Sequence, residues 1–207
     1  MRILALVLPS LLLVGVAQAK NRSNPGDWYL GFGLGNGQAS LTFDTPAGEI
    51  DKDYDDLFRL SDGQEVDSIR VSISLEGGVR IAPRFFAGLH LAGISQAGDV
   101  QGATFTVGHS QILGVVTYFP NRKGFFLRGG LGAATVNMTI DIPDADLRVR
   151  AEEKGTGAML GAGFALPISR SAHFTITLDA HAASFDGDPG APAVARFGTV
   201  QLGLTWF

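Results

Sequence analysis

Cysteine is absent from the 207 residues, and basic residues do not predominate. Without cysteine, the fold cannot use disulfide bonds or thiolate-ligated metals and must rely on packing and hydrogen bonding. The 16 Lys and Arg are outnumbered by 20 Asp and Glu, which gives a formal net charge of −4. Because no basic stripe is present, we expect no nucleic-acid partner.

Long apolar runs are also missing beyond the N-terminus. After Arg2, residues 3–17 are almost wholly apolar but are interrupted by Pro9, and Ala17-Gln18-Ala19 forms a small-x-small cleavage site. This order predicts a secretory signal peptide over residues 1–19 rather than an anchor, which needs about 20 apolar residues. We therefore expect one exported domain over residues 20–207, without a membrane-spanning helix.

What the sequence has instead is an alternation of apolar and polar residues with period two. In residues 68–81 the apolar side chains share one parity, and the polar and charged ones share the other. In a strand these two sets point to opposite faces, whereas a helix would mix them. Seven further segments are strand-like, at residues 28–35, 85–92, 103–119, 125–132, 157–166, 174–181 and 199–206. The parity of residues 103–119 stays open, and a slip near Thr135 indicates a β-bulge.

The connectors between these eight strands alternate in length and charge. Three are short and contain basic residues without acids, at residues 82–84, 120–124 and 167–172. They alternate with wider polar connectors, at residues 44–67, 96–102, 141–153 and 186–193. Charged residues and glycines occupy the polar face of the strands, as suits a narrow lumen. The pattern favours an all-β, eight-stranded antiparallel transmembrane β-barrel. A soluble sandwich or lipocalin-like barrel is the alternative.

The segment QLGLTWF at residues 201–207 resembles the C-terminal targeting signal of outer-membrane proteins. That signal usually has one residue between its two aromatics, whereas Trp206 and Phe207 are adjacent. With this end, the chain resembles the broad group of small eight-stranded bacterial outer-membrane β-barrel proteins. The resemblance implies the outer membrane of a Gram-negative bacterium, contact with outer-membrane lipid, and recognition of the C-terminal strand by the barrel-assembly machinery.

Two groups of strand residues invite a chemical interpretation. The glycine run 31–37 keeps period two and precedes no helix, so a lumen-lining strand is favoured over a nucleotide-binding loop. Asp179, His181 and Ser184 include the residue types of a nucleophilic triad, but Ser184 has the opposite parity. Only a bulge, or another residue such as Ser110, would complete the triad, so a polar lumen network is favoured.

Charged residues of the lumen-facing parity should pair across strands. Arg70, Arg80 and Arg128 share this parity with Glu76 and Asp179. Because like charges crowded in a narrow lumen are costly, we expect the acids and arginines to form one network. Glu76 lies between Arg70 and Arg80 on its own strand and is the expected centre.

The first wide connector, residues 44–67, contains nine acids and two basic residues. Residues 51–56 place oxygen ligands at alternate positions, as calcium loops do, but the turn glycine and the final glutamate are missing. A solvated acidic loop is favoured, and divalent cations remain a candidate partner. No catalytic, cofactor-binding or metal-binding residue is assigned. The apolar residues of the loop, Tyr54, Leu57, Phe58 and Leu60, are expected to fold back on the barrel rim or to touch a partner.

The expected function is non-enzymatic, in a structural or surface-interaction role. Eight strands leave an interior about filled by side chains, which predicts a lumen largely plugged by polar groups and no general porin activity. Two alternatives stay open. A narrow conduit for small apolar molecules needs a continuous lumen or a lateral opening between strands. A lipid-modifying enzyme needs a serine, a histidine and an acid that converge near the outer rim.

Overall fold

The computed structural model describes residues 27–45, 48–58, 67–100, 103–121, 124–142, 147–186 and 192–207. The elements are β1 (Trp28–Thr45), β2 (Gly48–Asp53), α2 (Tyr54–Leu57), β3 (Ser68–Ala82), β4 (Phe85–Val100), β5 (Ala103–Tyr118), β6 (Phe125–Ile142), β7 (Leu147–Pro167), β8 (Ala172–Phe185) and β9 (Pro192–Trp206). The predicted signal peptide, residues 1–19, lies outside the described residues.

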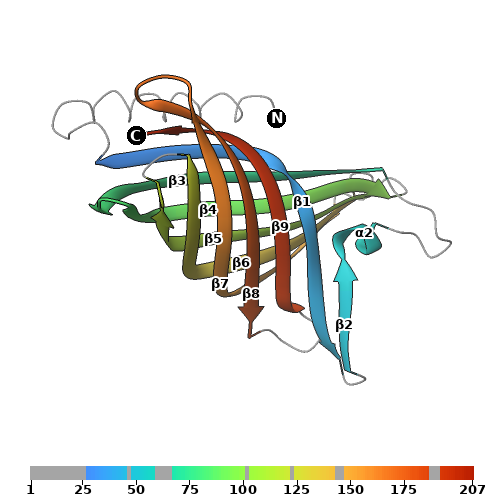
Figure 1. Ribbon diagram of the computed structural model, residues 1–207. Coiled ribbons are helices and arrows are strands. Elements are labelled where there is room, and N and C mark those ends of the chain that lie inside the picture. Colours follow the sequence, from blue (N-terminus) through green and yellow to red (C-terminus); the bar gives the residue numbers. More distant parts are fainter. Residues whose placement is uncertain are drawn as a thin grey trace.

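Eight of the strands close into an antiparallel barrel (Figure 1). Strands β3 to β9 pair in chain order, and β1 pairs with both β3 and β9. β2 is an additional strand that pairs only with β1. The predicted eight-stranded antiparallel barrel is confirmed, whereas β2 and α2 inside the acidic connector were not predicted.

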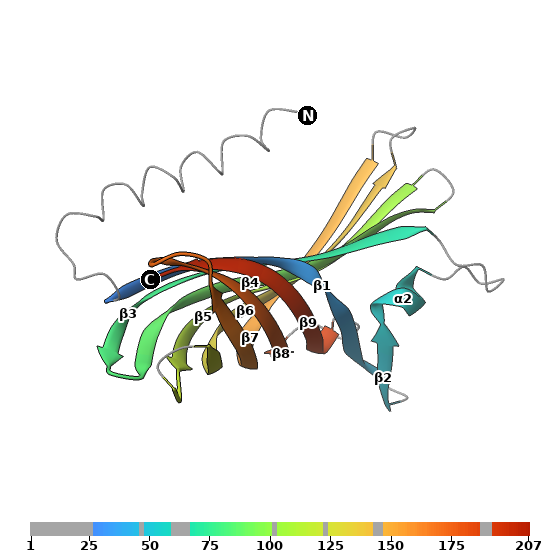
Figure 2. The same cartoon turned by 45° about the horizontal axis from the view of Figure 1, so that its top comes forward.

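Most barrel strands are longer than the alternation predicted, and their lengths run from 14 residues in β8 to 21 in β7. β4 continues to Val100, and β5 begins at Ala103. β6 likewise continues to Ile142, and β7 begins at Leu147. Most of the wide connectors predicted at residues 96–102 and 141–153 are therefore strand, and that prediction is wrong. Polar sequence stays in the ladder because its backbone groups are paired with the neighbouring strand. Figure 2 shows these hairpins projecting beyond the rest of the barrel.

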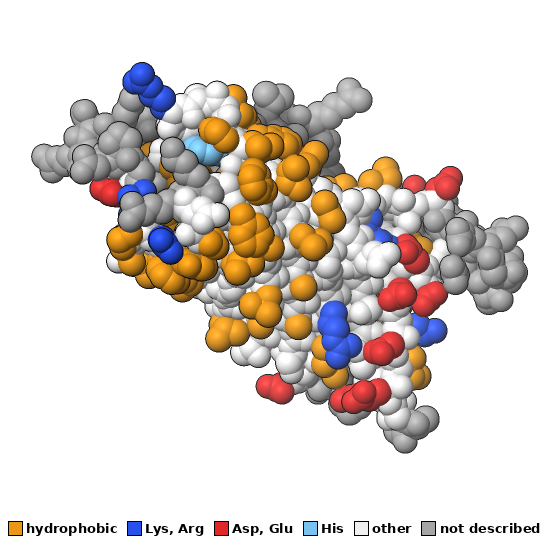
Figure 3. Space-filling view, in the orientation of Figure 1, with side chains coloured by type: hydrophobic (Ala, Val, Ile, Leu, Met, Phe, Trp, Pro, Cys, Tyr) orange, Lys and Arg blue, Asp and Glu red, His pale blue; other side chains and the backbone are white. Residues whose placement is uncertain are grey.

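The inward side chains change in polarity along the strands. In the turn half, next to the turns after β3, β5 and β7, outward apolar side chains are exposed; Leu131 and Leu160 are 74% and 73% accessible. In the loop half, which carries β2 and α2, apolar side chains such as Val107, Val136 and Phe197 are buried inside. Figure 3 shows hydrophobic side chains gathered toward one side of the visible face and acidic ones more frequent toward the other.

This change from polar to apolar inward side chains explains two irregularities in the sequence pattern. β6 pairs with β5 and β7 without a register shift through Thr135, so the bulge predicted there is wrong. The change in parity near Thr135 instead marks the level along the barrel at which the inward side chains change from polar to apolar. In β5 the odd-numbered residues face inward, from buried Val107 to Phe119, which settles the parity of residues 103–119.

The barrel wall contains a seam in its loop half. β1 pairs with β3 only as far as the pair Gly35 and Ser72. Beyond that pair, the same edge of β1 pairs with β2 from Ser40 onward, while β3 continues to Ser68 along β4. The seam is thus the interval between residues 36–39 of β1 and residues 68–71 of β3. α2 lies beside it (Figure 2).

Candidate functional site

Aromatic rings cross the lumen at the end of the turn half. Tyr29, Phe86, Phe119 and Phe126 are buried there, and Phe207 packs against them. The Tyr29 and Phe86 rings meet edge to face at 5.5 Å, and Phe119 and Phe126 lie 5.3 Å apart. These separations are typical of favourable aromatic pairs. We call these five residues the aromatic layer.

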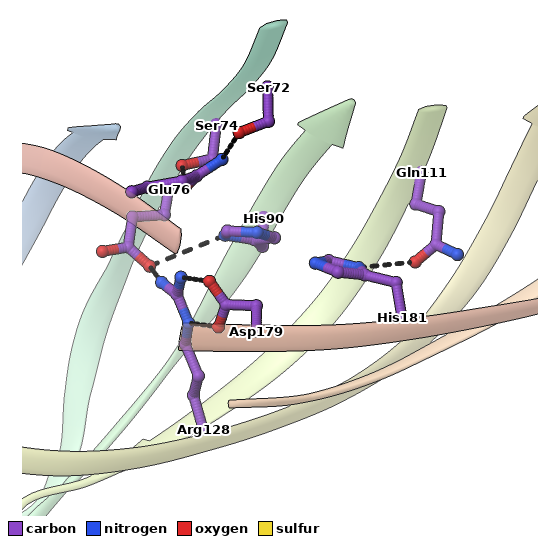
Figure 4. Close-up of polar contacts among 9 residues, drawn as sticks. Ser72, Ser74, Glu76, His90, Gln111, Arg128, Asp179 and His181 are labelled. Atoms are coloured by element: carbon purple, nitrogen blue, oxygen red, sulfur yellow. Dashed lines mark hydrogen bonds and ion pairs between the residues drawn. The ribbon is translucent and has the colours of Figure 1, made fainter. Parts of the chain in front are cut away.

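A buried ion cluster lies next along the lumen (Figure 4). Arg128 of β6 donates from Nε to Asp179 Oδ1 at 2.8 Å and from Nη2 to Asp179 Oδ2 at 2.5 Å. Its Nη1 donates to Glu76 Oε2 at 2.6 Å. Such a planar fork suits carboxylates held on two different strands, here β8 and β3. His90 Nδ1 lies 3.6 Å from Glu76 Oε2, and its ring is also buried.

The cluster corrects the prediction that Glu76 is the centre of the lumen network. Arg128 is the centre, and it joins the two acids. Arg70 and Arg80 do not reach Glu76, because at about 3.3 Å per residue they lie roughly 20 and 13 Å away along the same strand. Arg80 is exposed, with its guanidinium 5.3 Å from the Phe86 ring.

Glycines on the facing strands give these side chains their space. Gly31 pairs with Glu76 across β1 and β3, and a Cβ at Gly31 would lie 2.7 Å from Glu76 Oε1. Gly161 pairs with Asp179, and a Cβ there would overlap Asp179 Oδ1. The prediction that the glycine run lines the lumen is confirmed.

The suspected catalytic residues are not assembled. Asp179 is held by Arg128, and Ser184 is exposed on the outer face. His181 Nδ1 lies 3.1 Å from Gln111 Oε1, and the His181 ring stacks on Phe197 at 4.1 Å. Ser110 also faces outward. Asp179 and His181 instead make polar contacts inside the lumen, as the favoured interpretation predicted.

The loop half of the lumen contains the outer apolar layer, which the sequence pattern alone did not reveal. It consists of buried residues from six barrel strands, namely Ala39, Leu41, Ile94, Val107, Ala134, Val136, Ala183, Phe185, Ala195 and Phe197. The change in parity of the apolar residues was the signal for it. Tyr54 of α2 and the following Phe58 are buried against this layer. Burial raises the pKa of the Tyr54 phenol.

The prediction that the loop folds back on the barrel is confirmed for Tyr54, Leu57 and Phe58, which all pack in or against the outer apolar layer. Leu60 lies outside the described residues. The same connector holds the acids considered for calcium. Asp55 pairs with Arg70, and Asp51 accepts a 2.5 Å hydrogen bond from Thr42.

No group of three metal-ligating side chains occurs among the residues that the structure describes. Asp62 and Glu65 of the connector lie outside them. A divalent cation at this loop therefore stays a prediction.

An apolar outer band around a polar, charged interior defines a transmembrane β-barrel, because closure leaves no sheet edge in lipid. In the described part of the chain, no helix is long and apolar enough to cross a bilayer. The family model for the outer membrane protein β-barrel domain matches residues 6–206, and the chain belongs to this family. The protein is accordingly a barrel of the bacterial outer membrane.

Solved structures are similar to this chain at low sequence identity. One is Ail, the attachment invasion locus protein of Yersinia pestis, solved in complex with the heparin analogue sucrose octasulfate. It is 12% identical to this chain with a TM-score of 0.58, and the match covers 88% of this chain and 99% of Ail. Neisserial surface protein A is 12% identical with a TM-score of 0.48, and the match covers 89% of this chain and 99% of that protein. OprG from Pseudomonas aeruginosa is 15% identical with a TM-score of 0.44, and the match covers 88% of this chain and 95% of OprG. No curated protein matches the sequence significantly.

The orientation of the barrel can be tested on intact cells. Because long connectors of such barrels face outward, external protease should cut within residues 44–67 and spare the turn at residues 120–124. Cells with a permeabilised outer membrane provide the control, since both sites are then open to protease. Cutting at residues 120–124 alone in intact cells would reverse the assigned topology.

Proposed function

We propose that this protein is a non-enzymatic barrel with a structural or surface-interaction role, whose lumen is plugged and does not serve as a general pore. The observation that carries this proposal is the succession of buried layers along the lumen. The aromatic layer, the Arg128 cluster and the outer apolar layer follow one another, each built from several strands. A solute would have to displace all three.

The strands that project from the loop half support a role at the cell surface. About 9–11 residues suffice to cross the apolar part of a membrane, whereas β6 and β7 have 18 and 21. Most of residues 147–154 of β7 are exposed, including Leu147, Arg148, Val149 and Arg150. A hairpin with exposed apolar and basic side chains is a surface that a partner outside the cell can contact.

The non-enzymatic part of the proposal is supported by the geometry of Asp179, His181 and Ser184, the main triad candidates from the sequence. Asp179 is engaged by Arg128, while His181 and Ser184 lie on opposite faces of β8. A nucleophile needs its base within hydrogen-bond reach. Hydrolysis of phospholipid esters by the refolded protein at rates above those of empty vesicles would contradict the proposal.

Electrical recordings test the plug directly. In planar bilayers the wild-type barrel should give no stable single-channel steps, because three buried layers interrupt the water path. A general porin reconstituted under the same conditions is the control for insertion and sensitivity. Regular conductance steps from the wild-type protein would show an open pore and would refute the plugged lumen.

A narrow conduit for small apolar molecules is the second candidate function. Two observations favour it, namely the apolar interior of the loop half and the seam between β1 and β3. The buried charges of Arg128, Glu76 and Asp179 oppose a continuous apolar path to the turn half. The two candidates differ in an assay of transfer, in which only a conduit accelerates the movement of an apolar solute across a vesicle membrane.

A further inference from the structure

We propose that the outer apolar layer is a binding site for a small, mainly apolar molecule that carries one hydrogen-bonding group, and that this molecule enters sideways through the seam when α2 moves. The inference develops the second candidate function, since it places apolar molecules in the loop half. It requires binding there, but not passage through the rest of the barrel.

The seam is the one place along β1 where the described barrel wall lacks a continuous ladder. Gly35 and Ser72 are the last paired residues of β1 and β3. Every other neighbouring pair of barrel strands is hydrogen bonded well into the loop half, as in the pairing of Ala195 with Leu41 and with Ala183. Backbone separation at the seam therefore breaks no strand ladder, whereas an opening elsewhere would break several hydrogen bonds.

Side chains of the α2 segment occupy the space that a ligand would take. Tyr54 is fully buried, and Phe58 packs over Gly98 with its ring 5.2 Å from Phe105. Both side chains come from one short segment rather than from the barrel strands. Their displacement would leave a compartment with the shape and polarity of aromatic rings, without disturbing the wall.

One buried polar atom of the barrel wall, His109 Nδ1, indicates the chemistry of the ligand. The Tyr54 hydroxyl and His109 Nδ1 have no hydrogen-bond partner among the described residues. His109 lies among the layer's aromatics, with its ring 4.8 Å from Phe197 and 6.0 Å from Phe185. An unpartnered buried polar group is unfavourable, and a single donor or acceptor on an otherwise apolar ligand would remove that cost at His109.

A polar latch holds α2 at the seam. Arg70 of β3 donates from Nη2 to Asp55, and from Nη1 to the Gly37 carbonyl on β1 at 2.8 Å, so it spans the seam. Gln96 supports the latch by accepting from Arg70 Nε at 2.9 Å and by donating to Asp55 at 3.2 Å. Because the Asp55 side chain is 64% exposed, water can replace this contact at modest cost. The latch therefore permits α2 to move while the barrel stays folded.

A single introduced cysteine reports on the site, since the chain contains none of its own. In Ala183→Cys the thiol would lie in the outer apolar layer. Its modification by N-ethylmaleimide is measured in lipid vesicles, with and without 1-naphthol as the apolar probe. We expect 1-naphthol to slow modification in a saturable way. Unchanged rates up to the solubility limit of 1-naphthol would overturn the binding site.

The latch is tested in the same background. Arg70→Ala should raise the modification rate about tenfold, the population change that about 1.4 kcal/mol produces. Arg80→Ala is the matched control on the same strand, because Arg80 does not contact α2 or the seam. Its modification rate should equal that of Ala183→Cys alone. Equal rates for Arg70→Ala and Arg80→Ala would overturn the role of the seam. Asp55→Asn weakens the latch without deleting a large side chain, and should act in the same direction.

Three further outcomes test the site, and two of them separate it from the conduit. A sulfonate-bearing thiol reagent should stay slow in every variant, because the outer apolar layer disfavours a charged molecule; rates equal to those of N-ethylmaleimide would show a water-filled compartment and overturn the apolar site. Protection by 1-naphthol without faster transfer of 1-naphthol across vesicles supports the site and refutes the conduit. Faster transfer without protection would support the conduit and overturn the site.

Discussion

Replacing Arg128 by alanine should lower the free energy of unfolding by about 3–5 kcal/mol, the range measured when one partner of a buried ion pair is removed. Arg128 is 4% exposed, and its guanidinium makes three hydrogen bonds to two carboxylates. Its loss leaves Glu76 and Asp179 buried without their cation. Because both acids are negative, they would also repel each other across the lumen.

Reversible urea unfolding in lipid vesicles measures this effect. Arg80→Ala is the matched control, since an exposed arginine on a surface contributes about 0–1 kcal/mol. A double-mutant cycle with Glu76→Gln should show clear coupling to Arg128. A loss below about 0.5 kcal/mol for Arg128→Ala would be surface-like. That result would mean that water reaches the cluster, and the plugged lumen would have to be abandoned.

Truncating Phe126 to alanine is expected to cost about 3–5 kcal/mol, because a buried aromatic is removed and a cavity remains. Phe126 is 3% exposed, lies 5.3 Å from Phe119, and has the Arg128 guanidinium 5.9 Å from its ring. The variant therefore weakens the aromatic layer and one contact of the ion cluster together. Loss of the cation–π contact between Arg128 and Phe126 adds to the destabilisation, because both groups are buried.

The adjacent Phe125 provides the control for this prediction. It points outward from the same strand and is 41% exposed, so Phe125→Ala leaves no enclosed cavity in the lumen. Lipid chains fill the vacated space, and no cavity penalty arises. Unfolding of the two variants under identical conditions should show a clearly larger loss for Phe126→Ala. Equal losses would mean that the lumen is not tightly packed at this level.

The fold was largely predictable because strand alternation is a local property. A side chain's face in a strand depends only on whether its number is odd or even, so most polar lumen residues could be identified within their own segment. Asp179, Arg128 and Glu76 were placed correctly on the inner face in this way. The limits of the strands were not predictable, because pairing with a neighbour keeps polar sequence in the sheet.

The candidate site was predictable only in part. Its members were identified as lumen residues, but their contacts were assigned along one strand rather than across the barrel. Arg128 is separated by 51 residues from Asp179 and by 52 from Glu76. Which residues meet at such separations depends on the register and tilt of strands around the whole barrel, and this information is not local.

By itself, the sequence determined the class of the molecule, the number of barrel strands and the side of the wall on which Glu76, Arg128 and Asp179 lie, since all of these follow from period-two patterning and composition. The tertiary structure decided that Arg128 joins the two acids, that β1 parts from β3 beyond Gly35, and that Tyr54 and Phe58 cover an apolar layer at this seam. These features arise when strands distant in the chain close into a ring. The ring sets which side chains share the interior, and burial then selects the partners that can satisfy one another's charge and shape.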